Sequence, residues 1–252
     1  MPFAPVNGIQ LYYEVHGPAV GSAPVIVFAH GAGGNHISWW QQVPHFARTR
    51  TCITFDHRRY GQSVDTNGLG GAAYADDLAG LLDHLHIETF DLVAQSMGGW
   101  TSLAFALKCP GRIRRLVMAD THGGMVIPGL QVERQPIPEG AHPAIGPRMD
   151  EEQPALAFLY RQLMALTPPL EVMELFAHLN AIGAPTVEQV ATLAFPVLCI
   201  IGEEDLSIPP PLLEAATAVY PNATVARAPK AGHSVYFERP ALFNDLVERF
   251  LA

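Results

Sequence analysis

The chain has 252 residues, of which 49% are hydrophobic and 15% charged, enough apolar material for one substantial core. This composition excludes an intrinsically disordered chain, a collagen-like repeat and a small disulfide-stapled scaffold. Asp and Glu outnumber Lys and Arg by 24 to 15, for a formal charge of −9. Such a surface repels phosphate backbones, so we expect no nucleic-acid partner.

The first residues lack the basic and apolar regions of a signal peptide, and no apolar run approaches the ~18 residues that a membrane span needs. We therefore expect a soluble, cytoplasmic protein without a membrane partner, either a monomer or a homodimer. Cys52, Cys109 and Cys199 are odd in number, widely spaced and set in apolar stretches. This pattern predicts buried small side chains in a reducing compartment rather than disulfides.

Short runs rich in β-branched or aromatic residues recur along the chain and predict strands. The first run alternates polar and apolar residues, which predicts an antiparallel edge strand, whereas most others are apolar on both faces, as in a parallel sheet covered by helices on each side. The predicted strands are Ile9–Val15, Val25–Ala29, Thr51–Asp56, Phe90–Ala94, Ile113–Ala119, Pro196–Ile201 and Ala223–Ala228. The helices predicted between them are Ser38–Ala47, Ala72–Leu85, Met97–Lys108, Pro210–Tyr220 and Pro240–Leu251. Alternation of strand and helix predicts the α/β class.

One segment, residues 123–194, breaks this alternation because it contains no convincing strand. A Pro-rich stretch, Pro136–Pro147, is followed by amphipathic pieces at Pro154–Leu166, Leu170–Ile182 and Thr186–Thr192. Roughly seventy residues are too many for a plain loop. We interpret the segment as a helical cap or lid, with residues 1–122 and 195–252 forming the core domain. The alternative is that these are ordinary layer helices of the same domain.

The strongest local signal is Ser96, which lies between an apolar strand and a helix in Phe90–Trp100. A serine at such a junction is typical of a nucleophile elbow. The tight turn requires small residues two positions before and after it, and these are Ala94, in place of the usual glycine, and Gly98. At the helix N-terminus the amide of Met97 has no intrahelical acceptor and is predicted to face a developing oxyanion. The alternative is a serine that only caps a helix.

A glycine-rich loop, His30–Gly34, follows the strand Val25–Ala29. Glycines let the backbone approach a ligand and expose amide donors, so we predict the amide of Ala32 as the second oxyanion donor. The alternative is a turn without a ligand. A phosphate-binding loop is excluded by the absence of G-x-G-x-x-G spacing and of a following Lys-Ser/Thr pair.

A general base is predicted at His233, which lies on a loop between the last strand and the last helix. An imidazole can take a serine proton and return it to a leaving group near neutral pH. The carboxylate that orients it is predicted to be Asp205, just past the strand Pro196–Ile201, with Glu203 and Glu204 as nearby rivals. Asp120, just past another strand, is the alternative acid.

The order Ser96, Asp205, His233, with the glycine-rich loop upstream and a strandless insertion, resembles the α/β-hydrolase fold family over nearly the whole chain. This resemblance implies a mostly parallel eight-stranded sheet with helices on both faces and a helical cap inserted after strand 6. Residues 56–63 are similar to the family's D-x-R-G-x-G-x-S turn, from which Arg59 and Tyr60 depart, and we assign them to the scaffold. Residues 202–209 and 232–240 resemble its acid loop and its histidine segment.

A serine nucleophile excludes the dehalogenases and epoxide hydrolases of this fold, which use aspartate. The leading hypothesis is therefore a serine hydrolase that cleaves a small carboxylic ester or lactone through an acyl-enzyme. Ser96 attacks the carbonyl, His233 shuttles the proton, Asp205 holds the imidazole, and the amides of Ala32 and Met97 stabilise the oxyanion. We expect no metal and no organic cofactor.

Other functions on this fold stay open. A C–C bond hydrolase acting on a vinylogous diketone matches less well, because Gln95 and Ser234 stand where that group usually carries Asn and Trp. The sequence around Ser96 also resembles perhydrolases and cofactor-free dioxygenases, and a small-ligand receptor without turnover is the alternative outside enzymes. Predicted pocket walls, all equally compatible with core positions, are Trp39, Trp100, Met125, Met164 and Phe237.

Overall fold

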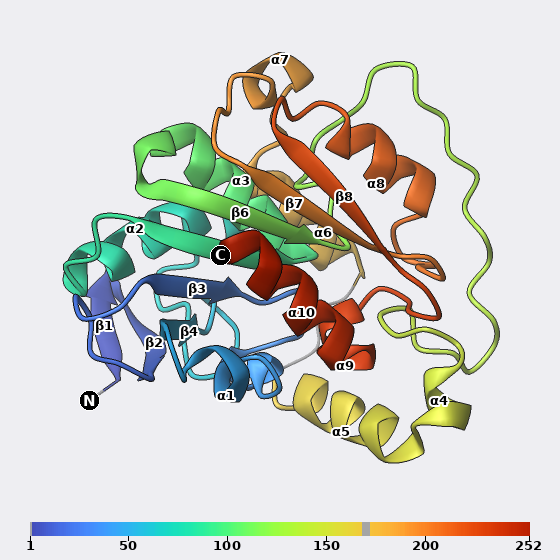
Figure 1. Cartoon of the computed structure of the whole chain (residues 1–252), viewed down its shortest axis with the longest axis horizontal. Helices are drawn as coiled ribbons and strands as arrows, with labels where there is room; N and C mark the ends of the chain where they lie inside the picture. Colours follow the sequence, from blue (N-terminus) through green and yellow to red (C-terminus); the bar gives the residue numbers. More distant parts are fainter. Residues whose placement is uncertain (1, 168–171) are drawn as a thin grey trace.

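The computed structural model describes residues 2–167 and 172–252, and its centre is one eight-stranded sheet with helices on both faces (Figure 1). The strands are β1 (Phe3–Val6), β2 (Ile9–His16), β3 (Val25–Ala29), β4 (Thr51–Phe55), β5 (Phe90–Gln95), β6 (Ile113–Ala119), β7 (Val197–Gly202) and β8 (Ala223–Ala228). Their order is β1-β2-β4-β3-β5-β6-β7-β8. The β1–β2 and β2–β4 pairs are antiparallel and the other pairs are parallel, which confirms the predicted fold class.

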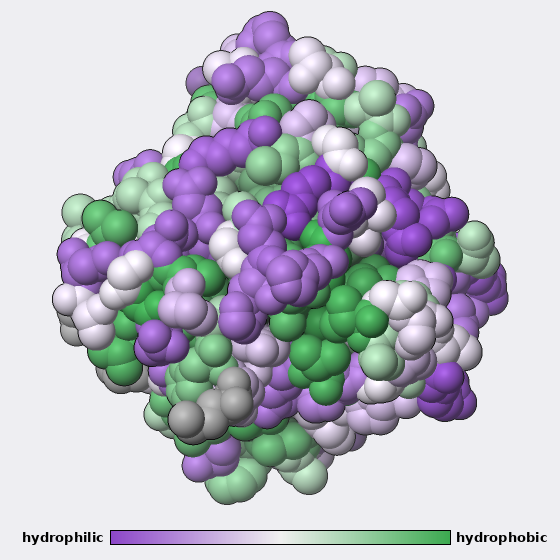
Figure 2. Space-filling model, turned by 90° about the vertical axis from the view of Figure 1, so that its left-hand side faces the viewer, coloured by the Kyte–Doolittle hydropathy of each residue, from purple (hydrophilic) through white to green (hydrophobic). Residues whose placement is uncertain are grey.

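Strand β1 was not among the predicted strands, and it displaces β2 from the edge of the sheet. β2 is antiparallel to both neighbours, as expected, but it lies between β1 and β4. The four residues of β1 include Pro5, and so short a run gives no periodic signal. A short edge strand with a proline also limits pairing with another chain. The face on this side of the molecule mixes hydrophilic and hydrophobic residues (Figure 2).

The described helices cover both faces of the sheet, and each face has its own hydrophobic cluster. Helices α2, α3, α7 and α8 contribute to one cluster, and α1, α5, α9 and α10 to the other. In chain order they are η1 (His36–Trp39), α1 (Val43–Phe46), η2 (Gly70–Ala73), α2 (Tyr74–His84), α3 (Met97–Lys108), η3 (Pro110–Arg112), α4 (Met149–Glu152), α5 (Pro154–Ala165), α6 (Val172–Ile182), α7 (Val187–Val190), α8 (Pro210–Thr217), α9 (Val235–Glu238) and α10 (Pro240–Leu251).

The predicted helix Ser38–Ala47 is in fact two short helices, η1 and α1. The side chain of Asn35 caps η1 by accepting from the amide of Ile37, so the first turn starts earlier than predicted. Pro44 at the start of α1 has no amide hydrogen and separates the two helices.

The segment between β6 and β7 carries α4, α5, α6 and α7. Helix α6 packs against η2 and α3, and the predicted helix Leu170–Ile182 begins here at Val172, because residues 170 and 171 lie outside the described residues. Helix α7 is different, since Val190 and the following Leu193 are buried in the main core with Val197. Residues 187–194 therefore pack as a layer of the core, as in the alternative interpretation of the segment.

No helix in the described part of the chain is both long and apolar enough to cross a bilayer. The cysteines are free thiols, of which Cys52 and Cys199 are buried and Cys109 is partly exposed, so the prediction of burial is wrong for Cys109. Burial raises the pKa of Cys52 to about 12 and that of Cys199 to about 11, which keeps both thiols protonated.

Candidate active site

Ser96 lies at the junction of β5 and α3 in a strained backbone conformation, with φ 48° and ψ −119°. A positive φ is uncommon for a residue with a side chain, and such strain is typical of functional turns. The junction is crowded, because a Cβ atom on Gly98 would lie 2.1 Å from the carbonyl oxygen of Ala29. Ala94 is fully buried and pairs with Ala29 in the β3–β5 register. The absence of a side chain at Gly98 is therefore required sterically, and Ala94 packs at the same junction.

The structure brings Ser96, His233 and Asp205 together from three separate loops. The distance from the Nε2 atom of His233 to the Oγ atom of Ser96 is 2.8 Å, and that from its Nδ1 atom to the Oδ2 atom of Asp205 is also 2.8 Å. With Nδ1 protonated, the imidazole donates to the carboxylate and accepts the serine hydroxyl, as a general base must.

Asp205 is held by its other carboxylate oxygen. The Oδ1 atom accepts hydrogen bonds from the amides of Ser207 and Ile208 at 2.8 and 2.9 Å, so Oδ2 is directed at the imidazole. Burial alone would lower the pKa of His233, but the charge and hydrogen bond of Asp205 outweigh it, and the pKa is raised. The carboxylate thus stabilises the imidazolium form.

Asp120, the alternative acid, makes no hydrogen bond to His233 within the described structure. Its Oδ1 atom accepts from the amide of Gly202 at 2.8 Å, and its Oδ2 atom accepts from the amide of Val235 at 3.2 Å. Burial, followed by the nearby charge of Asp205, raises the pKa of Asp120 well above its ordinary value. Asp120 therefore joins the end of β7 to the segment that carries His233, residues 232–238, which we call the histidine loop.

The two glutamates beside Asp205 also lie away from the imidazole. Glu203 is exposed, and an oxygen of Glu204 accepts a hydrogen bond from the guanidinium of Arg148 at 2.7 Å. Of the four carboxylates considered from the sequence, the structure brings only Asp205 into contact with His233.

The glycine-rich loop lies against the serine. A Cβ atom on Gly31 would be 2.1 Å from the Oε1 atom of Gln95 and 3.2 Å from the Cβ atom of Ser96. Ala32 and Met97 pack in one small cluster beside Ser96, and Met97 is the first residue of α3, where the amide has no intrahelical acceptor. The two residues predicted to supply the amide donors therefore pack together near the serine.

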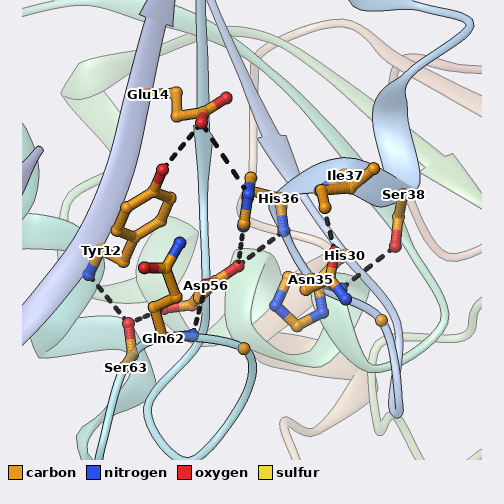
Figure 3. A network of polar contacts seen from close by, with 12 residues as sticks. Tyr12, Glu14, His30, Asn35, His36, Ile37, Ser38, Asp56, Gln62 and Ser63 are labelled. Carbon is orange, nitrogen blue, oxygen red and sulfur yellow. Dashed lines mark hydrogen bonds and ion pairs between the residues drawn. The ribbon is translucent and has the colours of Figure 1, made fainter. Parts of the chain in front are cut away.

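Asp56 joins His36, which follows the glycine-rich loop, to the turn after β4 (Figure 3). Asp56 accepts from the amide of His36 at 2.6 Å with one oxygen and from the amide of Gln62 at 2.7 Å with the other. His30 accepts from the amide of His57 at 3.0 Å, and burial lowers the pKa of His30 to about 4. The neutral His30 ring and the Asp56 carboxylate thus fix the shape of the loop, in agreement with a scaffold role for residues 56–63.

Three of the five predicted pocket residues are core residues. Trp39 packs against Phe28 and Tyr236, and Met125 and Phe237 are at most 1% exposed, so none of them offers surface to a ligand in this structure. Large buried aromatic and thioether side chains contribute most to a core, which is why their type alone does not mark a pocket.

The other two predicted pocket residues are partly exposed. The methyl group of Met164 would be 2.1 Å from a Cβ atom on Gly33, so this side chain covers the glycine-rich loop. The ring of Trp100 lies 5.5 Å from that of His122, on the turn after β6. Trp100 lies on α3, which begins directly after Ser96, and Met164 lies on α5 against the glycine-rich loop.

Two polar residues that we did not predict support the histidine loop. The side-chain amide of Gln95 donates to the carbonyl of His233 at 2.7 Å. The buried carboxylate of Glu238 accepts from the amides of Gly232 and Ser234. The place of Gln95 directly before the serine is a sequence signal that could have pointed to its role. Glu238 precedes Arg-Pro at the start of a helix, and nothing in the sequence there distinguishes it from an exposed residue.

In the ranges 2–167 and 172–252, no group of three His, Cys, Asp or Glu side chains is arranged to hold a metal ion.

Comparison with known proteins agrees with this architecture. Residues 24–137 match the family model for the alpha/beta hydrolase fold. A Caulobacter sp. (strain K31) protein named "Putative carbamate hydrolase RutD" is 28% identical over 96% of this chain and 96% of its own length. The enol-lactonase from Burkholderia xenovorans LB400 has a TM-score of 0.82 and 24% identity over 99% of each chain. Est816, described as an N-acyl homoserine lactone degrading enzyme, has a TM-score of 0.80 and 23% identity, over 99% of this chain and 100% of its own.

The two solved structures show the fold alone. Together with the sheet order, the strained serine turn and the hydrolase relatives, the match defines this protein as an enzyme of the α/β-hydrolase class. The chain has the α/β-hydrolase fold, and residues 24–137 match the model of that family.

Proposed function

We propose that this enzyme hydrolyses a small carboxylic ester or lactone through a serine-bound acyl intermediate. The observation that carries the proposal is the continuous hydrogen-bonded chain from Ser96 through His233 to Asp205, with both links at 2.8 Å. A serine on a strained turn next to a paired imidazole is the arrangement that activates a hydroxyl as a nucleophile.

The proposed reaction has two halves. In the first, the Oγ atom of Ser96 attacks the carbonyl carbon while its proton passes to Nε2 of His233, and the amides of Ala32 and Met97 stabilise the oxyanion. The bond from the carbonyl carbon to the alkoxide oxygen then breaks, and His233 protonates that oxygen. The acyl group stays bound to Ser96 as the acyl-enzyme. In the second half, water gives a proton to His233 and attacks the acyl carbon, and collapse of the intermediate returns the proton to Ser96. Asp205 stabilises the imidazolium in both halves.

The decisive experiment is Ser96→Ala. We expect the variant to fold normally and to lose roughly 10⁶ in kcat on aryl esters and lactones, because the three side chains act as a unit. A fluorophosphonate probe should label wild type at Ser96 and leave the variant unlabelled. Ester hydrolysis that persists in Ser96→Ala would refute the proposal.

Hydrolysis of a small carbamate is a second candidate, because relatives that align over nearly the whole chain carry the carbamate hydrolase name. The same serine chemistry applies, since a carbamate also presents a carbonyl carbon and a leaving group. Matched aryl acetates, lactones and carbamates, compared by kcat/KM, distinguish the two substrates. Labelling of Ser96 without turnover of any of them would instead favour a small-ligand receptor.

The C–C bond hydrolase alternative is tested by measuring cleavage of a vinylogous diketone. The perhydrolase and dioxygenase alternatives are tested by measuring consumption of peroxide and of oxygen. At the two positions where the sequence departs from the C–C hydrolases, Gln95 donates to the carbonyl of His233 and Ser234 donates to the carbonyl of Ala144. These side chains are engaged in supporting the histidine loop, which favours the ester or lactone reaction over C–C cleavage.

We propose that α4, α5 and α6 form a cap over the serine. Asn35, which follows the glycine-rich loop, donates to the carbonyl of Leu163 in α5 at 3.3 Å, and Met164 covers Gly33. Leu179 and Ile182 of α6 pack in the cluster that contains Met97. This cap ends before α7, so it is shorter than the predicted 123–194.

A further inference from the structure

A buried carboxylate that the proposed reaction does not use lies beneath the histidine loop. Glu238 is 3% exposed, and its two oxygens accept from the amide of Gly232 at 3.1 and 3.0 Å. They also accept from the amide of Ser234 at 3.2 Å and from the amide of Gly146 at 3.0 Å. These backbone dipoles offset part of the cost of burying the carboxylate, although burial still raises the pKa of Glu238. Only an acceptor with several lone pairs can satisfy such an arrangement.

Three backbones meet at this carboxylate without room for side chains. A Cβ atom on Gly232 would be 2.4 Å from the amide nitrogen of Gly146, and one on Gly202 would be 2.0 Å from the carbonyl oxygen of Gly232. The end of β7, the histidine loop and the segment before α4 are thus in direct contact. The carboxylate of Glu238 lies at this junction and accepts hydrogen bonds from amides of the histidine loop and of the segment before α4.

The histidine loop is also tied to the insertion by side chains. The hydroxyl of Ser234 donates to the carbonyl of Ala144 at 2.6 Å, so it is left to accept from the hydroxyl of Tyr160 at 3.1 Å. The side-chain amide of Gln153 donates to the carbonyl of Glu238 at 3.2 Å. Because each contact joins residues 232–238 to residues 144–160, the loop and the insertion cannot move independently without breaking buried hydrogen bonds.

We propose that Glu238 is a positioning residue, whose carboxylate fixes the loop that carries His233 and locks that loop to residues 144–146 of the insertion. The packing of residues 144–160 against the histidine loop and the orientation of the imidazole are then coupled. This inference rests on the proposed function of His233 as general base. Glu238 bonds neither Ser96 nor the imidazole ring in the described structure, so it acts through the backbone on each side of His233.

The charge of Glu238 gives the proposal a readout that mere packing would lack. The carboxylates facing His233 are Asp205, Asp120 and Glu238, and each raises the pKa of the imidazole. In Glu238→Gln the shape is retained, but one acceptor oxygen becomes an NH₂ group that faces backbone amides. The variant therefore loses accepted hydrogen bonds and one negative charge near His233.

The test compares wild type, Glu238→Gln and Asp91→Asn. Asp91 is an equally buried carboxylate at the far end of β5, paired with Arg50 and Arg114, and is the matched control for loss of stability. In Glu238→Gln we expect kcat to fall about 10- to 100-fold with little change in KM, because misplacement of a reacting group has effects of this size. The pKa of His233, followed by NMR of its ring, should fall, and the acidic limb of kcat/KM should move to lower pH.

Asp91→Asn should lower the unfolding midpoint without moving either the His233 titration or the acidic limb. Gly146→Ala is a second variant for the case in which Glu238→Gln does not fold. Its Cβ atom would lie 2.7 Å from Glu238, so it should separate the insertion from the carboxylate and lower kcat in the same direction.

A folded Glu238→Gln protein with an unchanged His233 titration and pH profile would overturn the inference, as would an effect that Asp91→Asn reproduces. The NMR titration needs no substrate. Turnover in Ser96→Ala would therefore refute the proposed function and leave the measured link between Glu238 and His233 standing.

Discussion

At the scale of single residues, three buried carboxylates surround one histidine and differ in what they contact. Asp205 bonds the imidazole, Asp120 bonds the amides of Gly202 and Val235, and Glu238 bonds amides on both sides of His233. All three are acidic side chains in the same buried region. Their expected contributions to catalysis and to stability differ because only one of them contacts the ring.

A comparison of Asp205→Asn with Asp120→Asn tests this difference. Loss of the carboxylate that orients the imidazole costs about 10⁴ in kcat in serine triads, and we expect a loss of this order for Asp205→Asn at neutral pH. Asp120→Asn should lower kcat far less and mainly lower the unfolding midpoint, because its amide group can no longer accept both backbone hydrogen bonds. Steady-state kinetics and thermal unfolding of both variants give the answer. A larger kcat loss in Asp120→Asn would reverse the assignment.

At the scale of elements, the position of α3 over the sheet depends on the absence of side chains at its first turn. Gly98 lies against the carbonyl of Ala29 at the end of β3, and Gly99 lies against the side chain of Thr121 after β6. The helix N-terminus, which carries the amide of Met97, can therefore approach both neighbouring strands. This packing links the stability of the β5–α3 junction to the geometry of the proposed oxyanion site.

Substitution of Gly98 by alanine should disturb that junction. The added methyl would overlap the carbonyl oxygen of Ala29, and we expect a loss of about 1–3 kcal/mol in unfolding free energy together with lower kcat. Gly111→Ala is the matched control, because no heavy atom lies within 4 Å of its would-be Cβ. Denaturant unfolding of the two variants measures the difference. Equal effects at both sites would mean that backbone entropy, and not the close contact, decides the cost.

At the scale of the whole molecule, the fold buries several neutral imidazoles close to the site. Burial lowers the pKa of His30 to about 4 and that of His57 well below its ordinary value. In the unfolded chain both titrate near ~6.5. As pH falls below the pKa of these imidazoles in the unfolded chain, the unfolded state binds protons that the folded state does not bind. The free energy of unfolding therefore decreases progressively below that pH.

His57→Asn tests this linkage. In wild type the slope of unfolding free energy against pH near pH 5 should include about one proton from His57, equivalent to about 1.4 kcal/mol per pH unit. The variant should lose that part of the slope, although it also loses packing against Phe55 and Tyr74 at every pH. Urea unfolding at a series of pH values measures both effects. An unchanged slope would show that His57 is protonated in the folded state.

We could predict from the sequence the layered α/β architecture, the bounds of β6, β8, α3 and α10, and the positions of Ser96 and His233 after strands. These features follow from local causes, since hydrophobic period, caps and the crowding at a tight turn are visible within a dozen residues. The short edge strand β1, with its proline, left no such signal.

The folded chain was needed to show that Asp205 and not Asp120 reaches the histidine, which aromatic side chains are core, and that Gln95 and Glu238 support the loop. Each of these depends on contacts between segments far apart in the chain, such as Gly146 with Glu238. The course of a loop past a strand end is set by backbone contacts with other loops. Residue type and spacing do not encode those contacts locally, so the sequence favoured Asp205 but left Asp120 open as the alternative acid.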